Sequence, residues 1–563
     1  MLWKLVGEFR LLLIASVIAS IIAGLGNVAL IASINAALTR SVTHSTILIE
    51  FALAAMTAVA GRTASGVLFH RLSQGVLAKL RLHIAAHILA ADYRDIEETG
   101  AAKINSALTD DSNQISVLFV SLPAVLTNMV IVAGCLAYLA FLSWPIFLLA
   151  LTAIAIGAFG YHGLHLRALK ELRAASESQV RLFDHFGAIV EGAKELKLNA
   201  AKRGILVNDL LGRAVSDVRR KRVAGLSWFC LSGGFGSFLI FAFIGVVLFA
   251  LTGDAPEQIG IATSFTLLFL YMVTPLEVLL NNIPQINLAR IAAQRVEQLL
   301  SLLPVVHTDA AARTPIDYEN GVQTLVLRDV AYAYRDRDSG EGFTVGPFDL
   351  SFARGELVFL VGGNGSGKTT LAKILTGLYV PTKGDILVNG VPVDHRNRED
   401  YRRFFAAIFF DFYLFESLIG VDGRNVDERG NRLVEQFDLQ QKVFVSAGAF
   451  STRSLSQGQR KRLALIAMLL EDRPFLVFDE WAADQDPLHR DVFYREILPD
   501  LKRLGKIVLV ISHDDRYFHL ADRVLKMRDG RIEADGVDRR GPESSAATVS
   551  GELRRPVAEP VFD

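Results

Sequence analysis

A glycine-rich run with an embedded lysine, GGNGSGKTT, occupies residues 362–370 of this 563-residue chain. It fits the pattern GxxxxGK[ST], with Gly362, Gly367, Lys368 and Thr369 at the fixed positions. The glycines allow backbone N–H groups to approach an anion without a Cβ in the way. A lysine here supplies charge to the β- and γ-phosphates of a nucleotide, and the threonine hydroxyl is a Mg²⁺ ligand. The run therefore predicts a site for a nucleoside triphosphate and Mg²⁺.

The elements beside this run are those that such a loop requires. Residues 357–361, LVFLV, are typical of a buried strand, and the sequence from Lys368 onward is typical of a helix. A strand–loop–helix order places the positive end of the helix dipole at the bound phosphate. We also assign four further residues of the loop to nucleotide binding, which are Asn364, Gly365, Ser366 and Thr370.

A second motif, LSQGQ at residues 455–459, opens another apparent helix. The two motifs together resemble those of the ATP-binding-cassette (ABC) ATPases, and the resemblance covers residues 325–535. In that family the serine and glycine of the second motif face the γ-phosphate of ATP held by another cassette, and here these residues are Ser456 and Gly458. Gln457 between them replaces a glycine of the family signature. Because the chain has one cassette, the resemblance implies a homodimer that binds ATP and Mg²⁺.

Two acidic residues end the apolar run FLVFDE at residues 475–480. The resemblance implies that Asp479 holds Mg²⁺ together with Thr369, and that Glu480 polarises the attacking water. Phosphoryl transfer needs mainly a positioned water and neutralised charge. The end of this predicted strand is therefore the expected site of hydrolysis.

Three further residues match functional positions of the family. His513 ends the apolar run at residues 507–513 and matches the histidine that senses the γ-phosphate, and with Glu480 and Lys368 it completes the predicted catalytic set. Tyr334 matches the aromatic residue that stacks on adenine, although a tyrosine of an ordinary strand is the alternative. Asp486 stands where the family has its dimer-contacting aspartate.

The chain departs from the family pattern beside these residues. Phe410 stands where the family usually has a glutamine that contacts Mg²⁺ and signals to the membrane domain. A phenyl ring can do neither by hydrogen bonding, so coupling through this loop must depend on packing or on Asp411. Residues 481–483, WAA, replace the common Pro-Thr-Ser. Since Glu480 and His513 are both present, we predict a hydrolytic site.

Composition indicates a membrane protein. Hydrophobic residues make up 51% of the chain, and residues 11–39, 112–166 and 223–253 contain no Asp, Glu, Lys or Arg. The formal net charge of zero suggests no nucleic-acid partner. Cys135 and Cys230 lie in apolar runs and predict neither a metal cluster nor a disulfide framework. A span needs about 20 apolar residues, and we predict six, at residues 11–38, 46–69, 116–141, 144–164, 223–251 and 259–283.

Basic residues predict the orientation of these spans. Residues 164–222 hold thirteen Lys and Arg and residues 70–111 hold five, whereas the short loops at 142–145 and 252–258 hold none. The positive-inside rule therefore places the long segments and both chain ends in the cytoplasm. Within the long segments, residues 92–103 and 191–199 are candidates for contact with the cassette, and solvated charged helices are the alternative.

The predicted fold is an α-helical membrane domain with six spans, fused to an α/β P-loop nucleotide-binding domain. Proline and polar residues interrupt the helical pattern after the last span, and the C-terminal residues are polar with few large apolar groups. We predict a membrane domain, a linker, a nucleotide-binding domain and a disordered tail, at residues 1–303, 304–322, 323–536 and 537–563.

The span count and domain order resemble the exporter half-transporters of the ABC superfamily. A narrower resemblance is to the bacterial cyclic-peptide exporters, which include pyoverdine-type siderophore and lipopeptide exporters. It is carried by FDEWAADQDP at residues 478–487, ISHDDRYFHLADR at 511–523 and FDFYLF at 410–415. It implies ATP-driven efflux of a peptide-type cargo across the bacterial inner membrane. All three motifs lie in the cassette, so the cargo class comes by analogy alone.

Two other functions stay open at this point. One is a lipid or drug exporter of the same architecture, and the other is a regulatory membrane ATPase without cargo. Ionisable residues inside spans usually face a cavity, and Glu50, Arg62 and Glu277 fall in or near predicted spans. In one hypothesis Glu277 and Asn281, one helical turn apart, line an inward-opening cavity. In the other, this end of the helix has left the bilayer and both side chains are simply solvated. Periplasmic or outer-membrane partners are not indicated by any motif.

Overall fold

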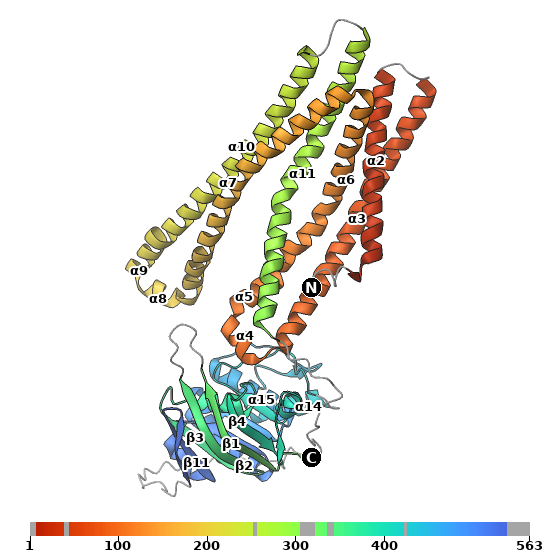
Figure 1. Cartoon of the computed structure of the whole chain (residues 1–563). Coiled ribbons are helices and arrows are strands. Elements are labelled where there is room, and N and C mark those ends of the chain that lie inside the picture. Colours follow the sequence, from red (N-terminus) through yellow and green to blue (C-terminus); the bar gives the residue numbers. More distant parts are fainter. Residues whose placement is uncertain are drawn as a thin grey trace. The chain divides into compact units, whose positions relative to one another are not determined.

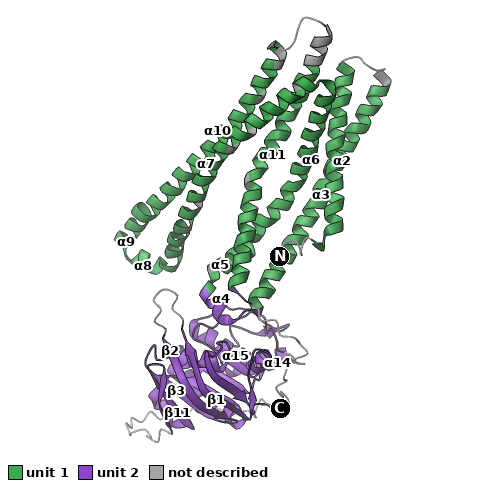
Figure 2. Cartoon of the chain, viewed as in Figure 1, with its two compact units in different colours: residues 1–89, 99–302 green, residues 90–98, 303–563 purple. Residues whose placement is uncertain are grey.

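The computed structural model describes residues 7–38, 44–250, 256–304, 321–334, 343–421 and 425–536. It contains two compact units, which Figure 2 distinguishes by colour. Unit 1 comprises residues 1–89 and 99–302, and unit 2 comprises residues 90–98 and 303–563. The predicted tail at 537–563 and nearly all of the predicted linker at 304–322 lie outside the described residues.

Unit 1 is helical, and its six long helices are apolar and long enough to cross a membrane. At 1.5 Å per residue, α3 with 47 residues and α7 with 48 residues are each about 70 Å long. The hydrocarbon core of a bilayer is only about 30 Å thick, so these helices extend well beyond the lipid, as predicted. The six long helices are α2 Arg10–Leu38, α3 His44–Ala90, α6 Ser112–Leu142, α7 Trp144–Glu191, α10 Gly212–Ala250 and α11 Pro256–Leu302.

Short helical segments connect the long ones. They are α5 Ala101–Ser106, the π-helical turn η1 Ala107–Asp111, α8 Ala193–Leu198, α9 Ala200–Gly204 and the π-helical turn η2 Ile205–Leu211. Figure 1 shows α7 and α10 side by side, joined through α8 and α9. Small residues allow α2 and α3 to approach closely: a Cβ at Gly26 would lie 2.7 Å from the Ala58 nitrogen, and one at Gly61 would lie 2.8 Å from the Ala23 nitrogen.

Unit 2 contains two larger sheets and a short hairpin. The six-stranded sheet has the order β12-β11-β3-β10-β9-β6 and is parallel except for β12, and the four-stranded antiparallel sheet has the order β2-β1-β4-β5. The strands are β1 Thr324–Ala333, β2 Thr344–Ala353, β3 Leu357–Gly362, β4 Lys383–Val388, β5 Val391–Pro392, β6 Phe405–Ile408, β7 Val445–Ser446, β8 Ala449–Phe450, β9 Phe475–Asp479, β10 Ile507–Ile511, β11 Arg523–Arg528 and β12 Arg531–Gly536.

Helices cover the parallel sheet. They are α12 Lys368–Leu375, α13 Arg398–Arg402, α14 Val426–Gln436, α15 Gln457–Glu471, α16 Pro487–Val492 and α17 Leu498–Arg503. Three shorter turns complete the unit, namely η4 Trp481–Asp484, η5 Phe493–Ile497 and η6 Asp515–Leu520. Helix α4, Tyr93–Thr99, comes from the first part of the sequence, but residues 90–98 pack within unit 2.

The apolar strands β9 and β10 are buried along their whole length. Successive side chains of β9 enter two different cores: Leu476 and Phe478 pack in one, and Val477 packs in the other. Both faces of a parallel sheet are covered, which is why these strands are unbroken apolar runs in the sequence. Because both faces are covered, polar side chains occur only at or after the end of each of these strands, where the chain leaves the core. The carboxyl ends of β3, β9 and β10 therefore gather the functional groups at one edge of the sheet.

Candidate functional site

The loop between β3 and α12 has the backbone geometry of a phosphate-binding loop. Gly367 adopts a left-handed conformation, with φ +99°, immediately before α12 begins at Lys368. Gly362 ends β3, and a Cβ there would lie 2.2 Å from the carbonyl oxygen of Met527. Glycine at these two positions is thus required by the turn and by the neighbouring backbone. The loop ends at the amino terminus of α12, where the helix dipole favours an anion.

Polar groups of this loop point to an anionic ligand. The Lys368 ammonium donates hydrogen bonds to the carbonyl oxygens of Gly362 at 2.8 Å and Gly363 at 3.0 Å, so it curls over the loop. Burial lowers the pKa of Lys368, against the opposing fields of Glu480 and Asp479. The Ser366 hydroxyl is buried and has no hydrogen-bond partner among the described residues. A phosphate oxygen would satisfy it.

Thr369 and Asp479 fit the predicted Mg²⁺ site. The Thr369 hydroxyl donates to a carboxylate oxygen of Asp479 at 2.9 Å, which joins the start of α12 to the end of β9. Burial raises the pKa of Asp479, and the nearby carboxylates of Glu480 and Asp411 add to this effect. Within the described ranges, no group of three or more His, Cys, Asp or Glu gathers to hold a metal. Mg²⁺ commonly takes one or two protein ligands together with nucleotide phosphates, and this pair matches that requirement.

Glu480 and His513 lie together at the edge of the parallel sheet. Strands β9 and β10 pair with Asp479 opposite Ile511, so the residues just beyond them are neighbours. The His513 Nε2 and Glu480 Oε1 atoms are 3.1 Å apart. Glu480 has a left-handed backbone with φ 52°, held by the hydrogen bond from its N–H to the Ile511 carbonyl. Such a conformation costs on the order of 1–3 kcal/mol for a residue other than glycine and is typical of functional sites.

Tyr334 lies at the mouth of the phosphate-binding loop. Its hydroxyl is 2.8 Å from the Thr370 hydroxyl, and its ring packs edge-on against Tyr332 and Tyr379. It lines a cavity of about 360 Å³ together with Phe343, the loop residues 364–370 and Glu480. Phe343 was not singled out from the sequence. Its exposed ring is a second aromatic surface of this cavity, and no motif marks it.

The residues of the second motif lie outside that cavity. Ser456 caps α15 and forms a capping box with Gln459. The Gln457 side chain donates to Asp484 at 3.0 Å, and the Gln485 side chain donates to the Gly458 carbonyl at 3.1 Å. The motif therefore contacts the segment that follows Glu480 in the same chain rather than the lining of its own phosphate-binding cavity.

Asp486 and Phe410 border this region. Asp486 caps α16 by accepting from the His489 N–H at 3.1 Å, and this hydrogen bond lowers the pKa of Asp486. The ring of Phe410 is 60% exposed, and the Lys461 ammonium is 5.8 Å from its centre. Burial lowers the pKa of Lys373, but the carboxylate of Glu97 outweighs it and raises the pKa overall, and Asp411, beside Phe410, adds a smaller increase.

Helix α4 makes polar contacts inside unit 2. Glu97 accepts hydrogen bonds from the Tyr379 hydroxyl at 2.5 Å and from the Lys373 ammonium at 2.9 Å. The guanidinium of Arg94 lies over the ring of Tyr332, 5.2 Å from its centre. The contact predicted for residues 92–103 is thus found at the α4 part of that range, where the solvated alternative does not hold. The sequence singled out none of these individual partners, because a lone acid on a short helix carries no motif.

Comparison with known proteins agrees with both halves of the chain. The family model for the transmembrane region of ABC transporters matches residues 9–276, and the family model described as ABC transporter matches residues 345–483. A solved structure of a bacterial Atm1-family ABC exporter with ATP bound has a TM-score of 0.76 over 94% of this chain and 95% of that chain, at 16% identity. At that identity the likeness concerns the fold.

Several relatives match over most of the sequence, among them the following two. The ATP-binding protein SyrD of Pseudomonas syringae pv. syringae is 32% identical over 528 residues, which cover 92% of this chain and 93% of SyrD. An ATP-dependent lipid A-core flippase of Cupriavidus metallidurans is 26% identical over 507 residues, covering 84% of this chain and 81% of the flippase. The chain belongs to the ABC transporters and is an exporter half-transporter, a multi-pass membrane protein whose cytoplasmic ATP-binding domain hydrolyses ATP to drive transport.

Proposed function

We propose that two copies of this chain form a homodimer that exports a peptide-type cargo across the bacterial inner membrane. The cargo class comprises cyclic peptides, peptide siderophores and lipopeptides. The observation that carries ATP-driven transport is the Glu480–His513 pair beside the phosphate-binding loop, in a chain that also has six membrane-spanning helices. Binding without hydrolysis would not require a carboxylate and a histidine in hydrogen-bond reach of each other.

The position of the second motif supports a homodimer. Ser456 and Gly458 do not line the cavity that holds Lys368 and Thr369 in the same chain. A second copy, facing the first head to tail, would bring its Ser456 and Gly458 to that cavity. Each of the two ATP sites would then be built from both chains, and neither site would be complete in one chain.

Each residue of the site has a defined part in the proposed reaction. Lys368 neutralises charge on the β- and γ-phosphates, and Glu480 orients the attacking water while His513 holds the Glu480 carboxylate and contacts the γ-phosphate. Thr369 and Asp479 would hold Mg²⁺, which when bound neutralises phosphate charge. ATP drives the change in the membrane domain through its higher affinity for the closed dimer, and hydrolysis resets the transporter.

The peptide class is supported by the motifs around Phe410, Glu480 and His513, which resemble those of the cyclic-peptide exporters. A lipid cargo is a second candidate, and a feature of unit 1 favours it. A cavity of about 210 Å³ between α7, α10 and α11 is lined almost entirely by apolar side chains, including Leu239 and Phe243. An acyl chain fits such a lining, and a lipopeptide would present both chemistries.

Glu277 is a polar residue on α11, one of the helices that line this apolar cavity. It is exposed on α11 and accepts a hydrogen bond from the Ser237 hydroxyl of α10 at 3.3 Å. Asn281, one turn later, is also exposed. We propose that these two side chains contact the polar part of the cargo. Export lost in Glu277→Ala, with basal ATP hydrolysis retained, would support this assignment, and normal export would contradict it.

The test uses the purified full-length chain in lipid vesicles. ATP hydrolysis is measured with and without cyclic peptides, peptide siderophores and lipids, for the wild type, Glu480→Gln and the control Glu496→Gln, an exposed glutamate on the same domain. We expect one peptide class to change the turnover, and Glu480→Gln to lower it by about 10²-fold or more. A response to lipids alone would favour the flippase, and a turnover that ignores every compound would favour a regulatory ATPase. Normal turnover in Glu480→Gln would overturn the catalytic assignment.

A further inference from the structure

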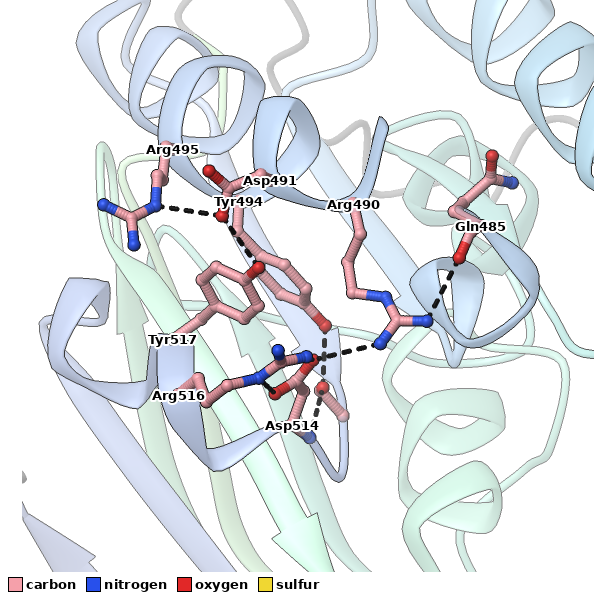
Figure 3. A network of polar contacts seen from close by, with 9 residues as sticks. Gln485, Arg490, Asp491, Tyr494, Arg495, Asp514, Arg516 and Tyr517 are labelled. Atoms are coloured by element: carbon pink, nitrogen blue, oxygen red, sulfur yellow. Dashed lines mark hydrogen bonds and ion pairs between the residues drawn. The ribbon is translucent and has the colours of Figure 1, made fainter. Parts of the chain in front are cut away.

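Arg490 of α16 lies between the segment that follows β9 and Glu480 and the segment that follows β10 and His513. Its Nη2 donates to the main-chain carbonyl of Gln485 at 3.1 Å, and its Nη1 lies 3.5 Å from a carboxylate oxygen of Asp514. Gln485 belongs to the segment after Glu480, and Asp514 directly follows His513. Figure 3 shows the guanidinium bridging these two groups. One side chain thus connects the strand ends that carry the catalytic pair.

Asp514 is held firmly at its end of this bridge. Arg516 donates two hydrogen bonds to its carboxylate, at 2.8 and 2.7 Å, and the Asp514 N–H donates to the Ser512 hydroxyl at 3.0 Å. The Ser512 hydroxyl also lies 2.7 Å from the hydroxyl of Tyr494, whose side chain is buried (Figure 3). Only 18% of the Asp514 side chain is exposed. The backbone that carries His513 is therefore fixed by the contacts of its neighbour.

Gln485 extends the connection at the other end. Its side chain donates to the Gly458 carbonyl at 3.1 Å, so the second motif lies directly beside it. Lys461, one turn into α15, donates to the Glu480 carbonyl at 2.9 Å and pairs with Asp484 at 2.8 Å. The second motif and the first turn of α15 are thus both joined to the segment that follows the catalytic glutamate.

These contacts form a continuous path within one chain. It runs from Gly458 through Gln485 and Arg490 to Asp514, and from there along the backbone to His513, which contacts Glu480. The path borders a cavity of about 300 Å³ that is lined by residues of the catalytic pair and by Arg490, Asp514 and Arg516. A displacement of the second motif would therefore reach the catalytic pair through this path.

We propose that Arg490 is a positioning residue that couples the two ATP sites of the dimer. The inference rests on the homodimer proposed above, in which the second motif of one chain completes the site of its partner. Closure of that motif on the partner's ATP sets the position of Gln485, and Arg490 transmits this position to Asp514 and His513. Each catalytic pair would then be aligned only when the other site holds ATP. Hydrolysis in the dimer is cooperative for this reason.

The guanidinium group suits this task. Its planar fork can satisfy two acceptors at once, whereas a lysine ammonium at the same place acts as a single point charge on a flexible stem. Arg490→Lys therefore keeps the charge near Asp514 and removes the fixed geometry toward Gln485. Arg495 is a matched control, because it belongs to the same network in Figure 3 but contacts Asp491, at 3.0 Å, and its side chain is 59% exposed.

The experiment measures ATP hydrolysis against ATP concentration for the full-length protein in lipid vesicles. The variants are Arg490→Lys, Arg490→Ala, Asp514→Asn, the double variant of Arg490→Lys with Asp514→Asn, and the control Arg495→Ala. Two coupled sites allow a Hill coefficient up to about 2. We expect a wild-type coefficient clearly above 1 that falls to about 1 in each Arg490 and Asp514 variant, with half-saturation changed by less than about threefold. The double variant should match the single ones, because they interrupt the same path.

Several results would overturn the inference. A Hill coefficient in Arg490→Lys equal to that of the wild type would do so, and so would an equal loss in Arg495→Ala. If Arg490→Ala fails to fold, Arg490→Lys and Asp514→Asn decide the matter. A wild-type coefficient of 1 would also refute the coupling while leaving export untouched, because this measurement needs no cargo. Normal turnover in Glu480→Gln, by contrast, would refute the catalytic assignment on which the proposed function rests.

Discussion

Glu97 accepts a 2.5 Å hydrogen bond from the hydroxyl of Tyr379, a residue 282 positions later in the sequence. Tyr379 stacks on Tyr332 and packs edge-on against Tyr334, which borders the nucleotide cavity. Glu97 also pairs with Lys373, five residues after Lys368 on α12. Helix α4 is thereby connected both to the aromatic side of the cavity and to the phosphate-binding helix. This connection does not involve Phe410, the residue that replaces the usual glutamine.

Removing this connection should uncouple transport from hydrolysis. In Tyr379→Phe and Glu97→Gln we expect basal ATP turnover within about twofold of the wild type and loss of the response to cargo. A double-mutant cycle should give an interaction energy of about 0.5–3 kcal/mol, as for residues in contact. The measurement is ATP hydrolysis in vesicles with and without cargo. Glu435→Gln is the control, because Glu435 is an exposed glutamate of α14; equal uncoupling there would refute the prediction.

The Glu97 contact should also make stability depend on pH. Burial opposes ionisation of Glu97, but the hydrogen bonds from Tyr379 and Lys373 outweigh it and lower the pKa below the ordinary 4.5. A lowered folded-state pKa means stabilisation that is present above about pH 4.5 and is lost as the pH falls through the folded-state value. The thermal midpoint of the full-length protein should therefore fall less between pH 6 and pH 4 in Glu97→Gln than in the wild type. Identical pH profiles would contradict this.

The Thr369–Asp479 pair should control the Mg²⁺ requirement. In Asp479→Asn we expect turnover to fall by about 10²-fold or more, with a smaller loss in Thr369→Ala, because the carboxylate is the stronger Mg²⁺ ligand. Titrating Mg²⁺ at fixed ATP should show half-maximal activity at higher Mg²⁺ in Thr369→Ala. Thr376→Ala is the control, since among the described residues the Thr376 hydroxyl bonds only backbone carbonyls of α12. An unchanged dependence of activity on Mg²⁺ in Thr369→Ala would contradict the assignment of Thr369 as a Mg²⁺ ligand.

Tyr334 and Phe343 should together set the affinity for the base of the nucleotide. Stacking on an aromatic ring contributes about 0.5–1.5 kcal/mol beyond area burial, so Tyr334→Ala should raise half-saturation by ATP by about two- to tenfold. Tyr334→Phe should change the half-saturation by ATP little, because it keeps the ring and removes only the contact with Thr370. Phe343→Ala should show a smaller increase of the same kind. Affinity for a fluorescent ATP analogue, measured in the Glu480→Gln background that we expect to hydrolyse ATP slowly, separates binding from turnover.

Much of the candidate catalytic site could be proposed from the sequence because its residues lie at fixed places in local patterns. The apolar runs at 475–479 and 507–511 become β9 and β10, adjacent and parallel, and so Glu480 and His513 meet at 3.1 Å. A strand followed by a glycine loop and a helix is likewise a local unit, which is why Gly367, Lys368 and Thr369 were identifiable. The six long apolar helices follow from length and composition in the same way.

The remaining contacts depend on tertiary structure. Glu97 and Tyr379, Arg490 and Asp514, and Phe343 at the nucleotide cavity belong to no motif, and the partners come from different elements of the fold. A charged side chain on a short helix has the same sequence appearance whether it is solvated or paired. The amino-acid order by itself determined the ATP-hydrolysing machinery and the membrane helices, because each is encoded by periodicity or by a local motif. Only the folded chain decided which polar side chains connect these parts, because such pairing requires two distant segments to meet at hydrogen-bond distance.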